Sequence, residues 1–352
     1  MKNVRWLSLI VALLVLLPNV ARADSVADFY KGNQISVFVS SAPGGGYDNY
    51  ARMLARHLGR HIPGSPGIVV KNMPGAGGAR AANHVYNVAP KDGTAVVMPQ
   101  NTLTIDQFTS TPSVKFDMRT FEWIGSMNVN QSVCLFSRAR APATHQELFS
   151  RKFILGASGG VTSSLALVPT LLNQLAGTKF EVINGYDGTN VVFLAMERGE
   201  VEGFCGIGWD SVRVQAGDRI KRGELVIGLD VGTIQDSELK AMGIPFALGL
   251  MTEGQEKQTL ALIMSVQLYG RPFAMPPGTP QDRVEAVRQA FAETMTDEAF
   301  VRDTTKANIQ IQYASPQQIV ESINVPFSAP QAIQNRALTE LRKAGWGGGA
   351  AQ

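Results

Sequence analysis

SAPGGGYDNYARMLARHLGRHIPGSPGIVVKNMPGAGG, residues 41–78, is the stretch that decides the fold. An apolar strand predicted at 35–39 runs into the glycine turn PGGG at 43–46, and an amphipathic helix is predicted to follow. A second strand, predicted at 68–71, ends in the glycine turn PGAGG at 74–78. Backbone amides at two strand ends, beside a helix N-terminus, form a cradle for an anion. The stretch therefore predicts a protein that binds a small anionic molecule.

Strand and helix patterns alternate along the rest of the chain, which is typical of an α/β protein. Strands are predicted at 35–39, 68–71, 94–98, 121–126, 132–136, 153–155, 181–183, 201–205, 225–229 and 260–267. Helices are predicted at 48–61, 79–88, 165–175, 191–198 and 281–294. Each half of the chain carries glycine-rich loops at strand ends, where open α/β sheets bind ligands. Two such halves that face one another form a cleft.

The N-terminal segment has the pattern of a secretory signal peptide. Lys2 and Arg5 supply positive charge, and the apolar run that follows at 6–17 is too short to span a bilayer. An A-x-A cleavage site at 21–23 predicts removal of residues 1–23. The alternative, an uncleaved membrane anchor, is disfavoured by the short apolar run and by this site. We therefore expect an exported protein that resides in the periplasm.

Charge and length exclude some classes of protein. The whole chain has 32 Lys and Arg against 29 Asp and Glu, but residues 1–23 hold three bases and no acid. The mature chain is therefore neutral, which argues against a nucleic-acid partner. Elsewhere no apolar run of the sequence is long enough to cross a membrane. The mature length exceeds that of a typical single core, so two domains are expected.

The chain has two cysteines, Cys134 and Cys205, each in an apolar, strand-like run. An exported chain can oxidise such a pair, but the sequence does not show that their Cα atoms lie close together. A free cysteine packs as a small hydrophobic residue, so two buried free thiols are the favoured interpretation over a disulfide. Two cysteines without a CxxC pattern do not predict a metal site, and no cofactor is expected.

The glycine turns do not match nucleotide-binding motifs. Counted from Gly44, the third glycine of G-x-G-x-x-G is replaced by Asn49. Counted from Gly75, it is replaced by Arg80, and the sequence contains no P-loop pattern. A nucleotide site is therefore disfavoured.

The sequence GASGG at 156–160 matches the G-x-S-x-G pattern of a nucleophile elbow, with Ser158 at the position of the nucleophile. That chemistry needs a general base, and in α/β-hydrolases the catalytic histidine follows the serine in the chain. Here every histidine precedes the serine: His57, His61, His84 and His145. The loop is better interpreted as hydroxyls and amides that hydrogen-bond an anion, so no enzymatic activity is expected.

Several polar residues near the glycine loops have two interpretations each. Asp48 is explained equally well as a first-turn acid that complements the helix dipole and as a ligand-binding residue. Gln100 and Asn101 lie at the exit of the strand predicted at 94–98, where a ligand would sit. Tyr186 either lines a pocket or packs in the core. Asp210 either faces the cleft or caps a helix that begins near the next residue.

At this point the residues resemble a known family. PGGGYD at 43–48, NMPGAGG at 72–78 and NVAPKDGTAVV at 87–97 resemble the substrate receptors of tripartite tricarboxylate transporters, the Bug-type periplasmic binding proteins. Weaker similarities are ASGGVTSS at 157–164, VINGYDGTNVVFLAMERGEVEGF at 182–204 and MPPGTP at 275–280. The order and spacing of these blocks cover most of the mature chain.

The resemblance implies an α/β, type II-like periplasmic binding protein with two lobes, each a sheet flanked by helices, around a cleft. It implies a first domain built from 24–128 and 235–345, a second domain at 129–234 and a flexible tail at 346–352. The expected ligand is a small carboxylate, and the expected partners are membrane symporter subunits. An accessory that presents its ligand to a membrane sensor kinase is the alternative, and a serine-type hydrolase is a more distant one.

The resemblance places ligand contacts in the first glycine loop and in the serine-rich loop of the second domain. Carried onto this chain, these residues are Pro43, Gly44, Gly45, Gly46, Tyr47, Asp48, Ser158, Gly159, Gly160, Val161, Thr162 and Ser163. Together with the residues considered above, the candidate site also includes Gln100, Asn101, Tyr186, Asp187 and Asp210.

The chain departs from the family's pattern in three places. Leu165 stands where many members have a histidine after the serine-rich loop. Asp187, in GYDGT at 185–189, replaces the lysine of the family's PYKGG and lowers the positive charge near the cleft. The segment at 249–260 is longer than is usual for the family.

Overall fold

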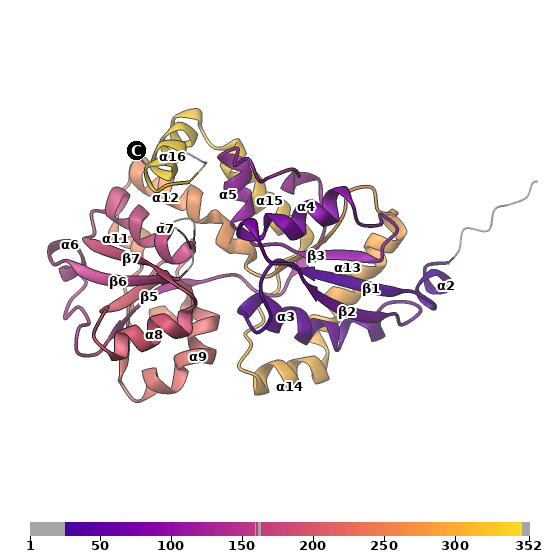
Figure 1. Cartoon of the computed structure of the whole chain (residues 1–352), viewed down its shortest axis with the longest axis horizontal. Helices are drawn as coiled ribbons and strands as arrows, with labels where there is room; N and C mark the ends of the chain where they lie inside the picture. The colour runs from indigo at the N-terminus through magenta and orange to yellow at the C-terminus, as the bar shows by residue number, and fades with distance from the viewer. Residues whose placement is uncertain (1–24, 159, 161–162, 347–352) are drawn as a thin grey trace, which may run out of the picture.

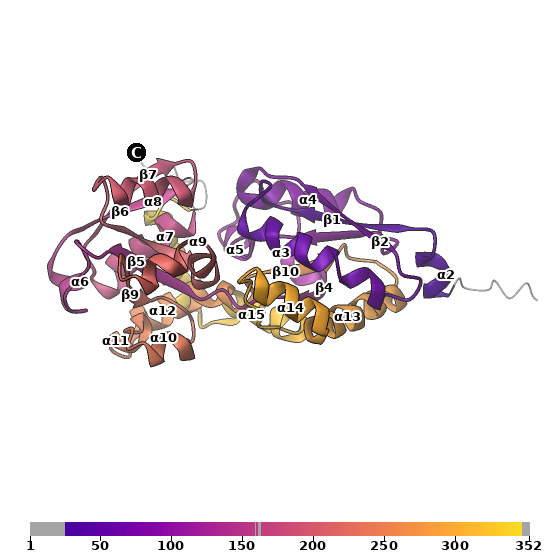
Figure 2. The ribbon, with the colours of Figure 1, turned by 90° about the horizontal axis from the view of Figure 1, so that it is seen from below.

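The structure is a computed structural model that describes residues 25–158, 160 and 163–346. It has two lobes, each built on a five-stranded sheet with helices on both faces (Figure 1). Seen from below, the lobes lie side by side and are joined by narrow connections (Figure 2). The predicted α/β fold with two lobes is confirmed.

The sheet of the first lobe has the order β2-β1-β3-β10-β4. Its strands are β1 (Gln34–Val39), β2 (Gly67–Asn72), β3 (Ala95–Met98), β4 (Glu122–Ser126) and β10 (Pro272–Met275). Strands β2, β1 and β3 are parallel, whereas β10 runs antiparallel between β3 and β4. Every residue of β3 and β10 is buried, as expected for central strands covered by helices on both faces.

Helices cover both faces of this first sheet (Figure 1). From the N-terminal part of the chain they are α2 (Val26–Tyr30), α3 (Gly46–Ala55), α4 (Ala79–Asn87) and α5 (Leu103–Phe108). From the C-terminal part they are α13 (Gln281–Thr296), α14 (Glu298–Lys306) and α15 (Pro316–Ser328). The first lobe is thus assembled from both ends of the chain.

The sheet of the second lobe has the order β7-β6-β8-β5-β9. Its strands are β5 (Ser132–Ser137), β6 (Phe153–Ser158), β7 (Phe180–Tyr186), β8 (Gly203–Gly208) and β9 (Leu225–Asp230). Here β5 is the antiparallel strand between β8 and β9. Each sheet therefore contains one strand that the chain supplies as it crosses from the other lobe.

The helices of the second lobe come mostly from the middle of the chain. They are α6 (Glu147–Ser150), α7 (Ser164–Leu171), α8 (Thr189–Glu197), α9 (Trp209–Lys221), α10 (Ser237–Ala241), α11 (Ala247–Leu250) and α12 (Gln255–Met264). The C-terminal helix α16 (Gln331–Lys343) packs against α12 on the same side of the molecule (Figure 1). The division into domains at residues 128 and 235 stays a prediction, although Leu239 of α10 packs in the core of the second lobe.

Two chain segments run side by side between the lobes. The Asn130 N–H donates to the Gln267 carbonyl oxygen at 2.7 Å, and the Gly270 N–H donates to that of Asn128 at 2.8 Å. A Cβ at Gly270 would lie 2.7 Å from the Asn130 nitrogen, so glycine is required for this close approach. The paired segments form a hinge, and the chain crosses a third time between α15 and α16.

Two sequence predictions about secondary structure are wrong. Residues 260–267 were predicted as a strand, but they lie in α12 and the 3-10 turn Ser265–Tyr269 that follows it. The error arises because almost every residue there is buried, which removes the helical period that periodicity detects. The helix predicted at 48–61 ends at Ala55 and continues as the 3-10 turn Leu58–His61.

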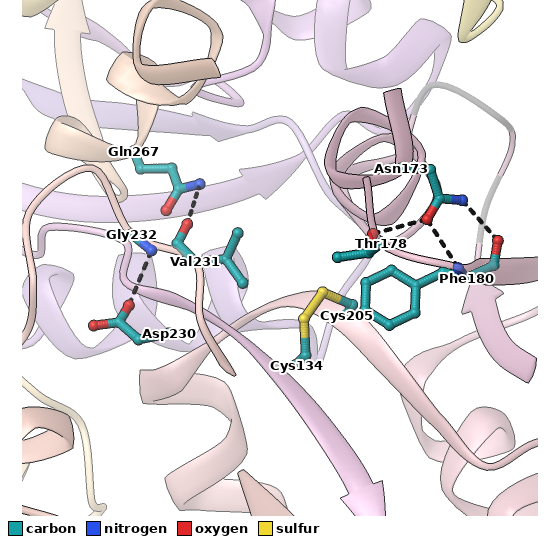
Figure 3. The surroundings of a disulfide bond; sticks show 9 residues. All are labelled: Cys134, Asn173, Thr178, Phe180, Cys205, Asp230, Val231, Gly232 and Gln267. Atoms are coloured by element: carbon teal, nitrogen blue, oxygen red, sulfur yellow. Dashed lines mark hydrogen bonds between the residues drawn. A yellow bond between two sulfur atoms is a disulfide. The ribbon is translucent and has the colours of Figure 1, made fainter. Parts of the chain in front are cut away.

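The interpretation of Cys134 and Cys205 as free thiols is also wrong. The two residues lie directly opposite each other on the adjacent strands β5 and β8, and they form a disulfide (Figure 3). Both are fully buried. The bond joins residues separated by 71 positions, so only the antiparallel register of the sheet reveals the pairing.

The structure tests the predictions for the two ends of the chain only in part. The predicted signal peptide and residues 347–352 of the predicted tail lie outside the described residues. Trp346, predicted as part of a flexible tail, is instead 1% exposed and packs in the largest hydrophobic core. No helix in the described part of the chain is long and apolar enough to cross a membrane.

Candidate functional site

A cavity of about 860 Å³ lies between the two lobes and is lined by residues of both lobes and of the hinge. Seven residues of the candidate site line it: Gly46, Tyr47, Gln100, Asn101, Ser158, Gly160 and Ser163. Seven others do not: Pro43, Gly44, Gly45, Asp48, Tyr186, Asp187 and Asp210. Gly159, Val161 and Thr162 lie outside the described residues. That any of these residues contacts a ligand stays a prediction.

Five of the described helices begin at the cavity, and in each of them the side chain of the N-cap residue accepts no capping hydrogen bond. They are α3, α4, α7, α8 and α9, whose N-cap residues are Gly45, Gly78, Ser163, Gly188 and Gly208. The first N–H groups of a helix have no partner inside it, and the helix dipole makes this end positive. Five such ends around one cavity create an environment that favours an anion.

The first glycine loop takes its shape from Asp48, which lies behind it. The carboxylate accepts hydrogen bonds from the Gly44 N–H at 2.8 Å, from Arg52 Nε at 2.9 Å and from Asn72 Nδ2 at 2.8 Å. Burial would raise the pKa of Asp48, but these hydrogen bonds hold it below its ordinary value. Of the two interpretations of Asp48, the structure favours a residue that organises the loop.

The second glycine loop also lines the cavity, although the candidate site omitted it. Gly75, Gly77 and Gly78 have φ of 130°, 62° and 98°, a region that favours glycine. A Cβ on Gly78 would lie 2.6 Å from Cγ of Gln100. Only glycine allows the loop to approach Gln100 and open α4 toward the cavity. The sequence pattern PGAGG was the available signal for these residues.

Tyr47 and Asn101 connect the first lobe to the hinge. The Tyr47 hydroxyl donates to Asn101 Oδ1 at 3.3 Å, and Asn101 Nδ2 donates to the Val266 carbonyl oxygen at 2.9 Å. Burial raises the pKa of Tyr47, so its hydroxyl stays protonated and available as a donor. Two hydrogen bonds thus link the start of α3 to the chain segment at Val266, next to the hinge.

Arg271 is the main cavity residue that sequence reasoning missed. Its Nη2 donates to Asp210 Oδ2 at 2.8 Å and its Nη1 donates to the Gly270 carbonyl oxygen at 2.9 Å, whereas its Nε has no partner in the described part of the chain. The guanidinium carbon lies 4.7 Å from the ring centroid of Tyr47 and 5.0 Å from that of Tyr50. Arg271 belongs to no motif, so only the insertion of β10 into the sheet brings it to the cavity.

The charge of Arg271 is preserved although the side chain is buried. Burial would lower the pKa of Arg271, but the negative charge of Asp210 raises it above its ordinary value. Asp210 itself begins α9 and lies beside the cavity-lining Ser211, whose N–H donates to Asp210 Oδ1 at 2.7 Å. Arg271 therefore stays charged and paired with Asp210, and its buried Nε–H has no partner among the described residues.

Among the described residues, four that line the cavity carry a buried polar atom for which that part of the chain offers no hydrogen-bond partner. The atoms are Asn130 Oδ1, Ser163 Oγ, Arg271 Nε and Trp346 Nε1. A buried polar group without a partner costs roughly 1–3 kcal/mol. Hydrogen-bonding capacity is thus concentrated where a ligand or water would satisfy it. The described residues contain no cluster of His, Cys, Asp and Glu suited to a metal ion, and no histidine among them lines the cavity.

Comparison with known proteins identifies the family. Residues 50–336 match the family described as the tripartite tricarboxylate transporter family receptor. A comparison with curated protein sequences finds no match. A solved TctC solute binding protein from Polaromonas, without ligand, has 19% identity and a TM-score of 0.65, covering 89% of this chain and 99% of that one.

Two solved structures that are also similar contain carboxylates. MatC from Rhodopseudomonas palustris, with bound malate, has 18% identity and a TM-score of 0.61, covering 88% of this chain and 99% of that one. An R. palustris protein with adipate has 16% identity and a TM-score of 0.64, covering 89% and 98%. These structures share the fold, and the family match covers most of the sequence. The chain therefore belongs to the tripartite tricarboxylate transporter receptor family, a family of periplasmic solute-binding proteins.

Proposed function

We propose that this protein is an exported receptor that captures a small carboxylate between its lobes and delivers it to a tripartite tricarboxylate-type membrane symporter. The observation that carries the proposal is the convergence of five uncapped helix N-termini on one interlobe cavity. An anion is the ligand that such an arrangement stabilises.

The unpartnered groups of the cavity suit a carboxylate. Arg271 Nε and Ser163 Oγ are buried donors that a carboxylate oxygen would satisfy from the two lobes. Hydrogen bonds to charged groups contribute roughly 1.5–3 kcal/mol each. A few of them account for micromolar binding, which corresponds to about −8.2 kcal/mol. The malate and adipate held by two proteins of the same fold support this class of ligand.

The proposal also includes export of the protein and delivery of its ligand to a symporter. Family membership supports a symporter as the partner, and the signal-peptide pattern at 1–23 supports export. Ser158 lines the cavity, but no histidine accompanies it among the described cavity residues, which supports binding rather than hydrolysis.

A thermal-shift screen tests the proposal. The mature chain, residues 24–352, is unfolded and refolded to remove any bound solute, and is then heated with a panel of carboxylates. A ligand at 100 times its dissociation constant stabilises the folded protein by about 2.7 kcal/mol, which raises the melting temperature visibly. The matched control is the neutral amide of each acid, which has the same shape without the charge. The proposal would be contradicted if no carboxylate of the panel raised the melting temperature. It would also be contradicted if the neutral amides raised the melting temperature as much as the acids do.

A further inference from the structure

One end of the cavity carries chemistry that a carboxylate does not need. Asp106 on α5, Thr111 in the following loop and Trp346 after α16 line this end, which we call the Asp106 pocket. Helices α5 and α16 lie on the same side of the molecule, near the junction of the lobes (Figure 1). None of its three residues belongs to the first turns of the five helices whose N-termini favour an anion.

Asp106 is a partly buried acid that has no cationic partner among the described residues. Its Oδ1 accepts a hydrogen bond from Thr111 Oγ1 at 3.4 Å. Burial raises the pKa of Asp106 to about 6, and the side chains of Trp346 and Thr111 offset part of this rise. No charged side chain of the described residues contributes to the shift. At neutral pH this pocket therefore holds a negative charge that nothing in the described structure neutralises.

The indole of Trp346 lies against Asp106 in this pocket. The residue is 1% exposed, and the proximity of its N–H to the carboxylate holds the pKa of Asp106 below the value that burial alone would give. An alkyl or aromatic ligand tail would displace water here and leave the carboxylate of Asp106 without solvation or a counter-charge. The occupant must therefore be polar, or must bring water with it.

The sign of the charge selects among polar groups. A second carboxylate on the ligand would face the carboxylate of Asp106 across a poorly solvated space, and like charges in such a space repel. A hydroxyl would hydrogen-bond to Asp106 but would leave its charge without a counter-charge. A protonated amine supplies both the hydrogen bond and the opposite charge.

We propose that the Asp106 pocket binds a protonated amine, so that the solute is an aminocarboxylate with its carboxylate at the helix N-termini and its amine against Asp106. The proposal rests on the proposed function, because it assigns the second end of the same ligand. It makes Asp106 the residue that distinguishes aminocarboxylates from dicarboxylates.

Calorimetric titration with ligands of equal length tests this proposal. The panel consists of straight-chain acids whose far end is an amine, a hydroxyl, a methyl group or a second carboxylate, in chains of three to six carbons. We expect the wild-type protein at neutral pH to bind the amine at least about tenfold more tightly than the dicarboxylate of the same length, a difference of about 1.4 kcal/mol. Asp106→Asn removes the charge at nearly the same volume, and should abolish the preference for amine over hydroxyl.

The matched control is Glu321→Gln, which removes an exposed acid from α15, the neighbouring helix. It should leave the preference unchanged. Equal or tighter binding of the dicarboxylate to the wild-type protein would overturn the assignment of the amine, as would an unchanged preference in Asp106→Asn. In either case carboxylate binding itself, and so the proposed function, would stand. If no member of the panel bound at any length, the proposed function would fail together with this inference.

Discussion

The Nη2 of Arg271 donates to Asp210 Oδ2 at 2.8 Å, and this ion pair joins the two lobes at the wall of the cavity. Arg271 directly precedes β10 of the first lobe, whereas Asp210 lies in the first turn of α9 in the second lobe. Their side chains are 6% and 3% exposed, so the pair is shielded from salt and water. Among the described residues, the buried Arg271 Nε has no hydrogen-bond partner, and we propose that it donates to the carboxylate of the ligand.

Arg271→Lys should weaken carboxylate binding by about 10- to 100-fold, because the lysine lacks the Nε–H and the planar fork of arginine. The positive charge remains for Asp210, so the fold should persist. Calorimetric titration measures the loss. Arg283→Lys is the matched control, since Arg283 also has an unpartnered buried Nε and is stacked on an aromatic ring, that of Phe29, but does not line the cavity. Equal losses in both variants would remove Arg271 from the site.

Two neighbouring glycines should respond differently to alanine. A Cβ at Gly46 would lie 3.3 Å from Arg271 Nη2 and 3.6 Å from Ser211 Oγ, so Gly46→Ala places a methyl group between the start of α3 and the guanidinium. A Cβ at Gly45 would meet only Ala42 O, at 3.6 Å, and Ser41 Oγ, at 3.9 Å. We expect about tenfold weaker binding for Gly46→Ala and unchanged binding for Gly45→Ala by the same titration. A larger loss of affinity in Gly45→Ala than in Gly46→Ala would contradict this prediction, and would place the ligand near Gly45 instead.

Binding of an aminocarboxylate should weaken in mild acid. As the pH falls below about 6, Asp106 becomes protonated and loses its attraction for the amine. Between neutral pH and about pH 5 the affinity should fall by roughly tenfold relative to the hydroxyl analogue, whose carboxylate titrates equally. The charged side chains on the elements around α5, none of which is a cause of the raised pKa of Asp106, are Asp117, Arg119, Glu321, Arg336, Glu340, Arg342 and Lys343. A constant ratio of affinities across this range would contradict the role of Asp106.

Asp106 should also make the ligand-free protein less stable at neutral pH. The pKa of Asp106 is about 6 in the folded protein against 3.8 for an ordinary aspartate, so the folded state binds the proton more tightly. The stabilisation that protonated Asp106 contributes is therefore fully present below pH 3.8, and it is lost as the pH rises through the folded-state pKa of about 6. Asp106→Asn should raise the free energy of unfolding at neutral pH by roughly 1–3 kcal/mol, with little gain near pH 4. Denaturant titrations at both pH values measure this, and an equal gain at both would exclude ionisation as the cause.

The disulfide should stabilise the second lobe without affecting ligand contacts. It closes a span of 71 residues between β5 and β8, and neither cysteine lines the cavity. Cys134→Ala together with Cys205→Ala should lower the free energy of unfolding by about 2–4 kcal/mol. Ligand affinity at a temperature where the variant is folded should stay within about twofold of the wild-type value. Thiol titration of the unfolded wild-type protein checks the bond, since two reactive thiols without reductant would show that it is absent.

Much of the fold could be predicted because its signals are local. The apolar strands at 35–39, 68–71 and 94–98 and the glycine turns between them depend on residues that are neighbours in the chain. Strand β10 and the C-terminal half of α12 were not predicted, because nearly uniform burial of these residues removes the periodicity that separates a short strand from a helix.

The candidate site likewise contains residues that belong to local sequence motifs and residues that do not. Gly46, Ser158 and Ser163 belong to motifs at strand and helix ends, and they line the cavity. Arg271 and Asp106 belong to no motif, and their chemistry depends on what lies beside them. The sequence position of Asp48 is compatible with ligand binding. Its role in organising the loop follows from hydrogen bonds with Gly44 and with Asn72, which is 24 positions away in the chain.

The sequence by itself determined the family, the alternation of strands and helices, and the glycine-rich helix N-termini that favour an anion, because each depends on short-range backbone geometry. The tertiary structure decided which residues share the cavity. It paired Cys134 with Cys205, set Arg271 against Asp210 and placed Asp106 beside Trp346. These relationships arise from sheet register and from repeated crossings between the lobes, which join residues far apart in the chain and leave no pattern within it.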